Sequence, residues 1–185
     1  KKKNKIKINK RQNQKRENLM EQVQTNETGT AKDNSVMAPD SVTPIELKIE
    51  RTFDASPEMV FDAWVERDQV AQWYGPEGMA VPLCEMDSTI GGSYRVCFQE
   101  PDGTDHIVVG SFKEIDRPNR LVFTWGWEED GVVGQVTEVS VEFAANGDKT
   151  DLTLTHRGFE TEDGMNGHKM GWTSSFESLA KLLAA

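Results

Sequence analysis

The sequence lacks long hydrophobic runs and is poor in cysteine, and both features exclude classes of protein. No stretch approaches the roughly 18 apolar residues of a membrane span, and no apolar signal region follows the basic start. We therefore expect a cytoplasmic protein that does not bind a membrane. Two cysteines, Cys84 and Cys97, are too few for a disulfide framework in a chain of 185 residues. We expect both thiols to be free and half-buried.

Motifs for catalysis, nucleotide binding and metal binding are also missing. The chain has no G-x-S-x-G elbow, no phosphate-binding loop and no G-x-G-x-x-G after a strand. Its three histidines, His106, His156 and His168, lie in different expected elements and without metal-ligand spacing. We therefore expect no metal and no cofactor, and no motif assigns a catalytic residue.

Positive charge is scarce outside the N-terminal segment. Residues 1–45 carry 10 of the 21 Lys and Arg and 5 of the 31 Asp and Glu, so their net charge is +5. Residues 46–185 hold the remaining 11 basic and 26 acidic residues, a net charge of −15. Nucleic-acid binding needs clustered Lys and Arg, so an acidic domain argues against that function.

Residues 1–44 are polar, low in complexity and without hydrophobic periodicity, which predicts a disordered extension before a domain at 45–185. One interpretation is a basic arm for RNA or anionic lipid. We favour the other, an upstream extension of the reading frame, with the working protein beginning at Met37. An intact mass of the natural product that includes residues 1–36 would contradict this.

The domain is predicted to begin with a strand and two short helices. Apolar and polar residues alternate over 45–53, as in a half-buried strand. Ser56 and Pro57 then form a helix start, with Ser56 as the cap. A second short helix is expected over 68–73, ended by a Gly-Pro pair.

Six further strands are predicted at 79–87, 93–99, 106–115, 120–127, 135–144 and 150–157, separated by short turns and the 128–134 loop. Turns this short connect strands that are antiparallel neighbours in a sheet. Each strand has one heavier apolar face, which in 120–127 includes both Trp125 and Trp127 and in 150–157 includes His156. We therefore expect a sheet with one dry face.

The stretch 163–183 supplies a cover for that face. Large apolar residues recur along it at helical spacing, at Met165, Trp172, Phe176, Leu179 and Leu183. Three glycines weaken the isolated helix, so the helix needs a partner surface.

A small-molecule site is expected between this helix and the sheet, because all five tryptophans fall on or beside elements that face the interior. The predicted ligand-binding residues are aromatic or polar groups on the inward faces: Trp64, Trp73, Tyr94, Phe98, Phe123, Trp125, His156, Trp172 and Phe176. Ordinary core packing explains some of these residues. We favour a hydrogen-bonded structural role for His156 and for His168, with a role as acid, base or donor in the pocket as the alternative for His156. Arg51 is either a polar tip of the pocket or a solvated strand end.

Several segments resemble one known family. They are I-E-R-T-F-D-A-S-P-E-M-V-F-D-A-W at 49–64, Q-W-Y-G-P-E-G at 72–78, G-G-S-Y at 91–94, E-I-D-R-P-N-R-L-V-F-T-W at 114–125, L-T-L-T-H-R-G-F at 152–159 and G-H-K-M-G-W-T-S-S-F-E-S-L at 167–179. Together they resemble the homologues of the activator of heat-shock-protein-90 ATPase, in the START-like (SRPBCC) superfamily. The chain departs from the pattern at Tyr74, where a second Trp is common, and in segment 79–86.

The resemblance implies an α+β helix-grip fold, in which a curved antiparallel sheet of six to seven strands wraps around the long C-terminal helix and two short helices follow the first strand. It implies a protein that binds a small hydrophobic or aromatic molecule, with a role in stress response or detoxification. Alternatives are an enzyme of the cyclase or hydrolase type that uses the same pocket through His156 or a carboxylate, and a module with a chaperone partner. We favour binding over catalysis.

Overall fold

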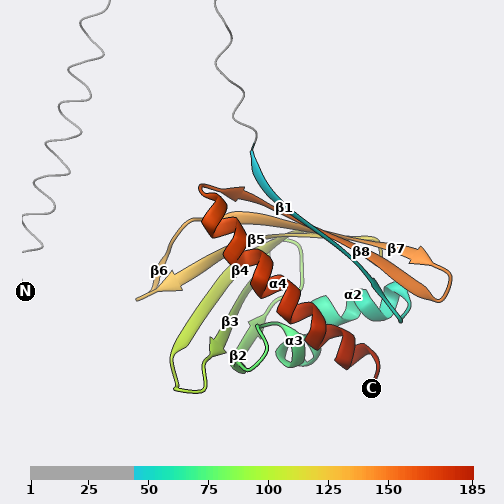
Figure 1. Cartoon of the computed structure of the whole chain (residues 1–185), viewed down its shortest axis with the longest axis horizontal. Coiled ribbons are helices and arrows are strands. Elements are labelled where there is room, and N and C mark those ends of the chain that lie inside the picture. Colours follow the sequence, from blue (N-terminus) through green and yellow to red (C-terminus); the bar gives the residue numbers. More distant parts are fainter. Residues whose placement is uncertain (1–43) are drawn as a thin grey trace, which may run out of the picture. The chain divides into compact units, whose positions relative to one another are not determined.

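Alternating apolar residues and short turns build a sheet over most of the domain (Figure 1). The computed structural model describes residues 44–185, so Met37 and nearly all of the predicted extension lie outside the described residues. The elements in chain order are β1 (Ile45–Phe53), α2 (Pro57–Val65), α3 (Arg67–Trp73), β2 (Ala80–Met86), β3 (Ser93–Gln99), β4 (Asp105–Asp116), β5 (Arg120–Glu129), β6 (Val132–Val133), β7 (Thr137–Asn146), β8 (Lys149–Phe159) and α4 (Glu162–Leu183).

All strand pairs are antiparallel, and the sheet order is β1-β8-β7-β5-β4-β3-β2. The two-residue strand β6 pairs with the outer end of β5, beyond the point where β7 leaves it. The sheet therefore has eight strands rather than six to seven, because the segment predicted as the 128–134 loop folds back as a short hairpin. The helix-grip architecture is otherwise as predicted, and α4 runs diagonally across one face of the sheet (Figure 1).

The dry face of the sheet is built from the predicted positions. Alternate residues of the three neighbouring strands β5, β7 and β8 are buried there: Leu121, Phe123 and Trp125 on β5, Thr137, Val139, Val141 and Phe143 on β7, and Leu152, Leu154 and His156 on β8. Trp127 is an exception, because 43% of it is exposed at the outer end of β5. The core is completed by three side chains of α4, namely Trp172, Phe176 and Leu179. Burial of each such side chain stabilises the fold by about 1.5–3 kcal/mol.

Local signals set the helix starts. The Ser56 hydroxyl accepts a hydrogen bond from the Met59 amide at 3.4 Å, and Pro57 occupies the first turn of α2. Thr161 caps α4 by accepting from the Gly164 amide at 3.1 Å. None of the helices within residues 44–185 is long and apolar enough to cross a membrane.

The two cysteines lie on neighbouring strands but do not pair. In the β2–β3 register Cys84 lies opposite Val96, and Cys97 lies opposite Leu83. The thiols are therefore offset by one residue, which places them on opposite faces of the sheet. Both are free, as predicted; Cys84 is half-buried and Cys97 is fully buried.

At Gly110 a side chain packs closely against the backbone of the sheet. The Tyr94 ring crosses β4 at this glycine, and its hydroxyl donates to the Thr124 carbonyl at 2.8 Å. A Cβ on Gly110 would lie 1.9 Å from that carbonyl oxygen and 2.6 Å from the Tyr94 ring.

We therefore expect Gly110→Ala to lower the free energy of unfolding by about 3 kcal/mol, at the upper end of overpacking costs. Gly134→Ala is the matched control, because its nearest contact would be an ordinary 3.8 Å. Urea denaturation of both variants measures the difference. Equal stabilities would show that the sheet accommodates a side chain at Gly110.

Candidate functional site

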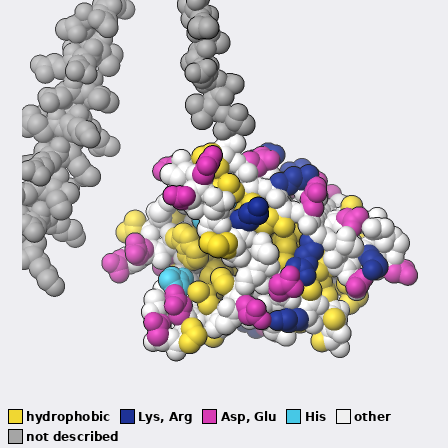
Figure 2. Space-filling view, in the orientation of Figure 1, with side chains coloured by type: hydrophobic (Ala, Val, Ile, Leu, Met, Phe, Trp, Pro, Cys, Tyr) yellow, Lys and Arg dark blue, Asp and Glu magenta, His cyan; other side chains and the backbone are white. Residues whose placement is uncertain are grey.

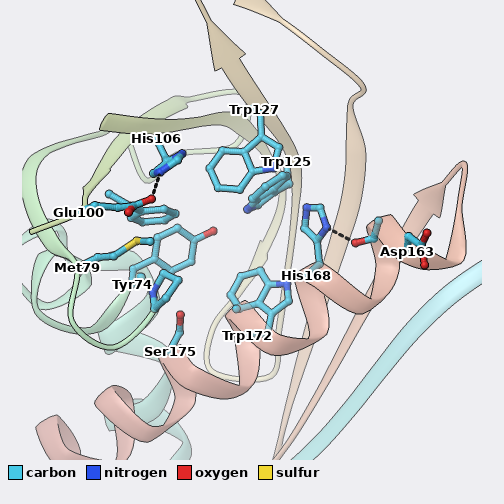
Figure 3. Close-up of a pocket in the computed structure, with 16 residues that line it drawn as sticks. Tyr74, Met79, Glu100, His106, Trp125, Trp127, Asp163, His168, Trp172 and Ser175 are labelled. Carbon is cyan, nitrogen blue, oxygen red and sulfur yellow. Dashed lines mark hydrogen bonds and ion pairs between the residues drawn. The ribbon is translucent and has the colours of Figure 1, made fainter. Parts of the chain in front are cut away.

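A cavity of about 420 Å³ lies between α4 and strands β3, β4 and β5 (Figure 3). The loop after α3 closes one side of it. The sheet and loop contribute Tyr74, Gly75, Pro76, Met79, Phe98, Glu100, His106, Trp125 and Trp127, and α4 contributes Asp163, Gly164, Gly167, His168, Gly171, Trp172 and Ser175. The lining is mostly aromatic and apolar, which is the usual character of a small-molecule site.

Glycines on α4 create the space. Gly164, Gly167 and Gly171 are separated by three and four residues, so they fall on one face of the helix together with Trp172 and Ser175. A Cβ added to Gly167 or Gly171 would meet no atom within 4 Å. The glycines that weaken α4 as an isolated helix therefore form one wall of the cavity.

The loop after α3 is attached to α4 on one side and passes close to β3 on the other. The Ser174 hydroxyl of α4 accepts from the Glu77 amide at 2.7 Å, and Lys181 forms an ion pair with the Glu77 carboxylate at 2.9 Å. A Cβ on Gly75 would lie only 3.1 Å from the Phe98 ring, so glycine permits this approach. These contacts hold Tyr74 over the cavity.

The mouth of the cavity carries a histidine–carboxylate pair. His106 Nε2 lies 2.6 Å from Glu100 Oε1, and their side chains are 39% and 40% exposed. Trp127 lies next to this pair, with its ring 6.3 Å from that of His106. Figure 2 shows hydrophobic side chains gathered on this part of the surface, with a histidine and acidic side chains at their border.

Tyr74 is the buried phenol of the site. It is 6% exposed, and burial raises its pKa more strongly than the neighbouring Tyr94 and Trp125 side chains lower it. The phenol is therefore neutral at physiological pH and keeps its proton as a hydrogen-bond donor.

His156 lies behind the cavity wall in a directional hydrogen-bond network. The Trp172 indole can only donate, so His156 Nδ1 accepts from it, at 3.2 Å. Nε2 therefore carries the proton and donates to Thr137 Oγ1 at 2.7 Å, and Thr137 Oγ1 in turn donates to the Trp125 carbonyl at 2.9 Å. The side chain is fully buried, and this burial, with a smaller contribution from His168, lowers the pKa of His156 to about 3. His156 thus orients Trp172 and does not line the cavity.

His168 faces the cavity from the first half of α4. Its Nδ1–H donates to the Gly164 carbonyl at 2.7 Å, and its ring lies 4.5 Å from that of Trp125. Burial lowers the pKa of His168, against the opposing effect of the hydrogen bond to Gly164. The ring is therefore neutral, and its other nitrogen presents a lone pair rather than a proton.

The predicted ligand-binding residues fall into three groups. Phe98, Trp125 and Trp172 line the cavity. Trp64, Tyr94 and Phe123 border a second void of about 20 Å³, which has room for no more than a water molecule. Trp73, His156 and Phe176 belong to the packed core. Arg51 lies outside the cavity and forms an ion pair with Glu177 of α4 at 2.7 Å.

Sequence reasoning did not assign most of the lining residues to the site. Tyr74, Met79 and Glu100 lie just outside regular elements, and their positions depend on loop geometry. The glycine spacing on α4 was the available signal, because glycines three and four residues apart in a helix share one face.

The described residues offer no group of three or more His, Cys, Asp or Glu side chains placed to hold a metal ion. Outside the cavity, several large apolar side chains around the end of β5 are exposed, namely Val132, Val133 and Val136. A chaperone partner stays a prediction.

A family model described as Activator of Hsp90 ATPase homolog 1-like protein matches residues 54–184. Among solved structures, the chain is similar to the AHSA1 protein of Silicibacter pomeroyi, with 31% identity, a TM-score of 0.69, and coverage of 76% of this chain and 98% of that one. A Rhizobium loti protein has 27% identity and a TM-score of 0.65, with 76% and 98% covered. A Chromobacterium violaceum protein shares the fold at 24% identity and a TM-score of 0.68, with 76% and 97% covered. No curated protein matches the chain.

Proposed function

The chain belongs to the family of Activator of Hsp90 ATPase homolog 1-like proteins, and on this premise we propose that it is a cytoplasmic protein that binds a small, largely apolar aromatic molecule. The single observation that carries the proposal is the cavity of about 420 Å³ between α4 and the sheet. Its volume falls within the usual range of small-molecule sites, and rings from both sides face into it. A role in stress response or detoxification is part of the proposal.

Three aromatic walls support an aromatic rather than an aliphatic ligand. Trp125 and Trp127 approach from β5, with ring centroids 4.6 Å apart and nearly perpendicular planes. Trp172 approaches from α4, where it stacks on Trp64 at 5.8 Å. Rings fixed by such contacts offer flat faces to a flat ligand at low cost in side-chain entropy.

Tryptophan fluorescence tests the proposal, because three of the five tryptophans line the cavity. Titration with neutral flavonoids and polyketides should change the emission in a saturable manner, whereas fatty acids should give a weaker response. A flat response to the whole panel would contradict the proposal. The same panel with Trp127→Phe separates a signal at the mouth from one deeper in the cavity.

A second candidate function is an enzyme that transfers protons, and the observation that favours it is the Glu100–His106 pair at the cavity mouth. A carboxylate that holds an imidazole is a common arrangement for a general base. Glu100→Gln should abolish turnover of any substrate found for the protein while the fold is retained. Unchanged turnover would remove this candidate.

A further inference from the structure

Within the described residues 44–185, the Tyr74 hydroxyl and His168 Nε2 line the cavity as buried polar atoms without a hydrogen-bond partner. The Trp125 indole N–H and the Ser175 hydroxyl also line the cavity and make no hydrogen bond of 3.5 Å or less to these residues. The three residues that carry donors, Tyr74, Trp125 and Ser175, are at least nine-tenths buried, with exposed fractions of 6%, 6% and 5%. In Figure 3 they come from different elements and point into the same space. Buried polar groups are normally paired, so three unpaired groups in one cavity indicate a missing partner.

The chemistry of these groups defines what that partner must offer. The indole can only donate a hydrogen bond, and the two hydroxyls donate readily. The two donors on the sheet and loop side, Tyr74 and Trp125, lie near each other in Figure 3. An oxygen with free lone pairs, such as a carbonyl or ether oxygen, fits this arrangement.

Charge in and around the cavity decides against an anionic ligand. No lysine or arginine is among the described residues that line it, whereas Glu100 and Asp163 are. Residues 46–185 carry a net charge of −15. A carboxylate or phosphate buried here would have no counter-ion, and burial of an unpaired charge is costly.

From these two observations we infer that the cavity takes a neutral, flat aromatic ketone or ether, whose oxygen accepts hydrogen bonds from the Tyr74, Trp125 and Ser175 side chains. This inference rests on the proposed binding function and specifies the ligand class. Carboxylates, including fatty acids, are excluded from tight binding.

A matched pair of compounds tests the inference by equilibrium dialysis. 9-Fluorenone and fluorene have the same planar shape, and only the ketone carries an acceptor oxygen. Fluorene is the more apolar, so hydrophobic transfer alone favours it. We expect fluorenone to bind the wild-type protein about fivefold more tightly, as one net hydrogen bond provides.

The variant Tyr74→Phe/Ser175→Ala removes two donors and no other atoms of the cavity wall. Among residues 44–185 the Tyr74 hydroxyl has no hydrogen-bond partner and the Ser175 hydroxyl makes no hydrogen bond, so the variant should fold with unchanged or higher stability. We expect it to lose about fivefold in affinity for fluorenone and less than twofold for fluorene. Thr173→Ala is the matched control, because this exposed hydroxyl of α4 donates to the Lys169 carbonyl outside the cavity, and the variant should keep the preference for fluorenone.

Each other outcome overturns the inference in a distinguishable way. If fluorene binds the wild type as tightly as fluorenone and the variant binds both unchanged, the donor role is wrong while the proposed binding function stands. If fluorene-9-carboxylate binds as tightly as fluorenone, or N-methylacridinium binds more tightly, the assignment to neutral ligands is wrong. If none of the four compounds binds, the inference and the proposed function fail together.

Discussion

Gly171→Leu should weaken the binding of a flat aromatic ligand by about tenfold or more than tenfold, and by no less than about fivefold, while the protein remains as stable as the wild type. The new side chain would project into the cavity, because no atom lies within 4 Å of a Cβ at this position. Ligand and leucine would then compete for the same volume, and such a clash costs about 1–3 kcal/mol, or roughly tenfold per 1.4 kcal/mol. Replacement of a helical glycine by leucine also favours the helical conformation of α4 by about 0.8 kcal/mol, so the variant should not lose stability.

Asn166→Leu is the matched control for this prediction. It also adds leucine to α4, but Asn166 is exposed and does not line the cavity. Dissociation constants for wild type and both variants, measured by the same titration, separate occupation of the cavity from a general effect of an apolar residue on the helix. Full affinity in Gly171→Leu would mean that the ligand binds elsewhere.

His156→Ala is expected to lower the free energy of unfolding by about 3–5 kcal/mol at pH 7. The substitution leaves a cavity in the core and deprives the Trp172 indole N–H of its acceptor. Thr137 keeps its bond to the Trp125 carbonyl, so only one donor is left unpaired. Chemical denaturation measures the loss, and a cost below about 1 kcal/mol would contradict the structural role assigned to the network.

The same variant has a pH signature. The folded protein holds the pKa of His156 at about 3, mainly because the side chain is buried, whereas the unfolded chain takes up this proton near pH 6.5. Between these values the unfolded state binds more protons at this site. The stability that neutral His156 contributes is therefore complete above pH 6.5 and declines by up to about 1.4 kcal/mol per pH unit towards pH 3.

His156→Ala lacks this decline. The stability gap between wild type and variant should therefore narrow by about 2 kcal/mol from pH 7 to pH 5. Parallel stability curves over that range would show that His156 titrates in the folded protein as it does in the unfolded chain.

The fold was predictable because its signals are local and repeated. Period-two alternation marked the long strands to within two residues of their ends, and the Ser56–Pro57 start placed α2. The one missing strand, β6, has two residues, which is too short for alternation to be detected. The prediction that the apolar face of β5 points inward is confirmed up to Trp125. Beyond this residue, Trp127 is partly exposed at the cavity mouth.

The site was less predictable than the fold. The alternation of side chains along a strand predicts which of them point inward, but it does not predict whether an inward side chain packs against protein or borders a cavity. Trp73 and Trp125 were equally good candidates by pattern. Trp73 instead donates to the Ala63 carbonyl at 2.7 Å within the core, while Trp125 faces the cavity. What separates them is the position of the α4 glycines and of the loop that carries Tyr74, and both depend on tertiary packing.

A crystal of the protein soaked in 2-bromofluorenone tests most directly whether the space between α4 and the sheet is a ligand site. The account predicts an anomalous bromine peak inside the cavity bounded by Phe98, Trp125 and Trp172, with the ketone oxygen within hydrogen-bond distance of Tyr74 or Trp125. A bromine peak only on the exposed valines around β6, or a cavity filled by rearranged side chains, would contradict it.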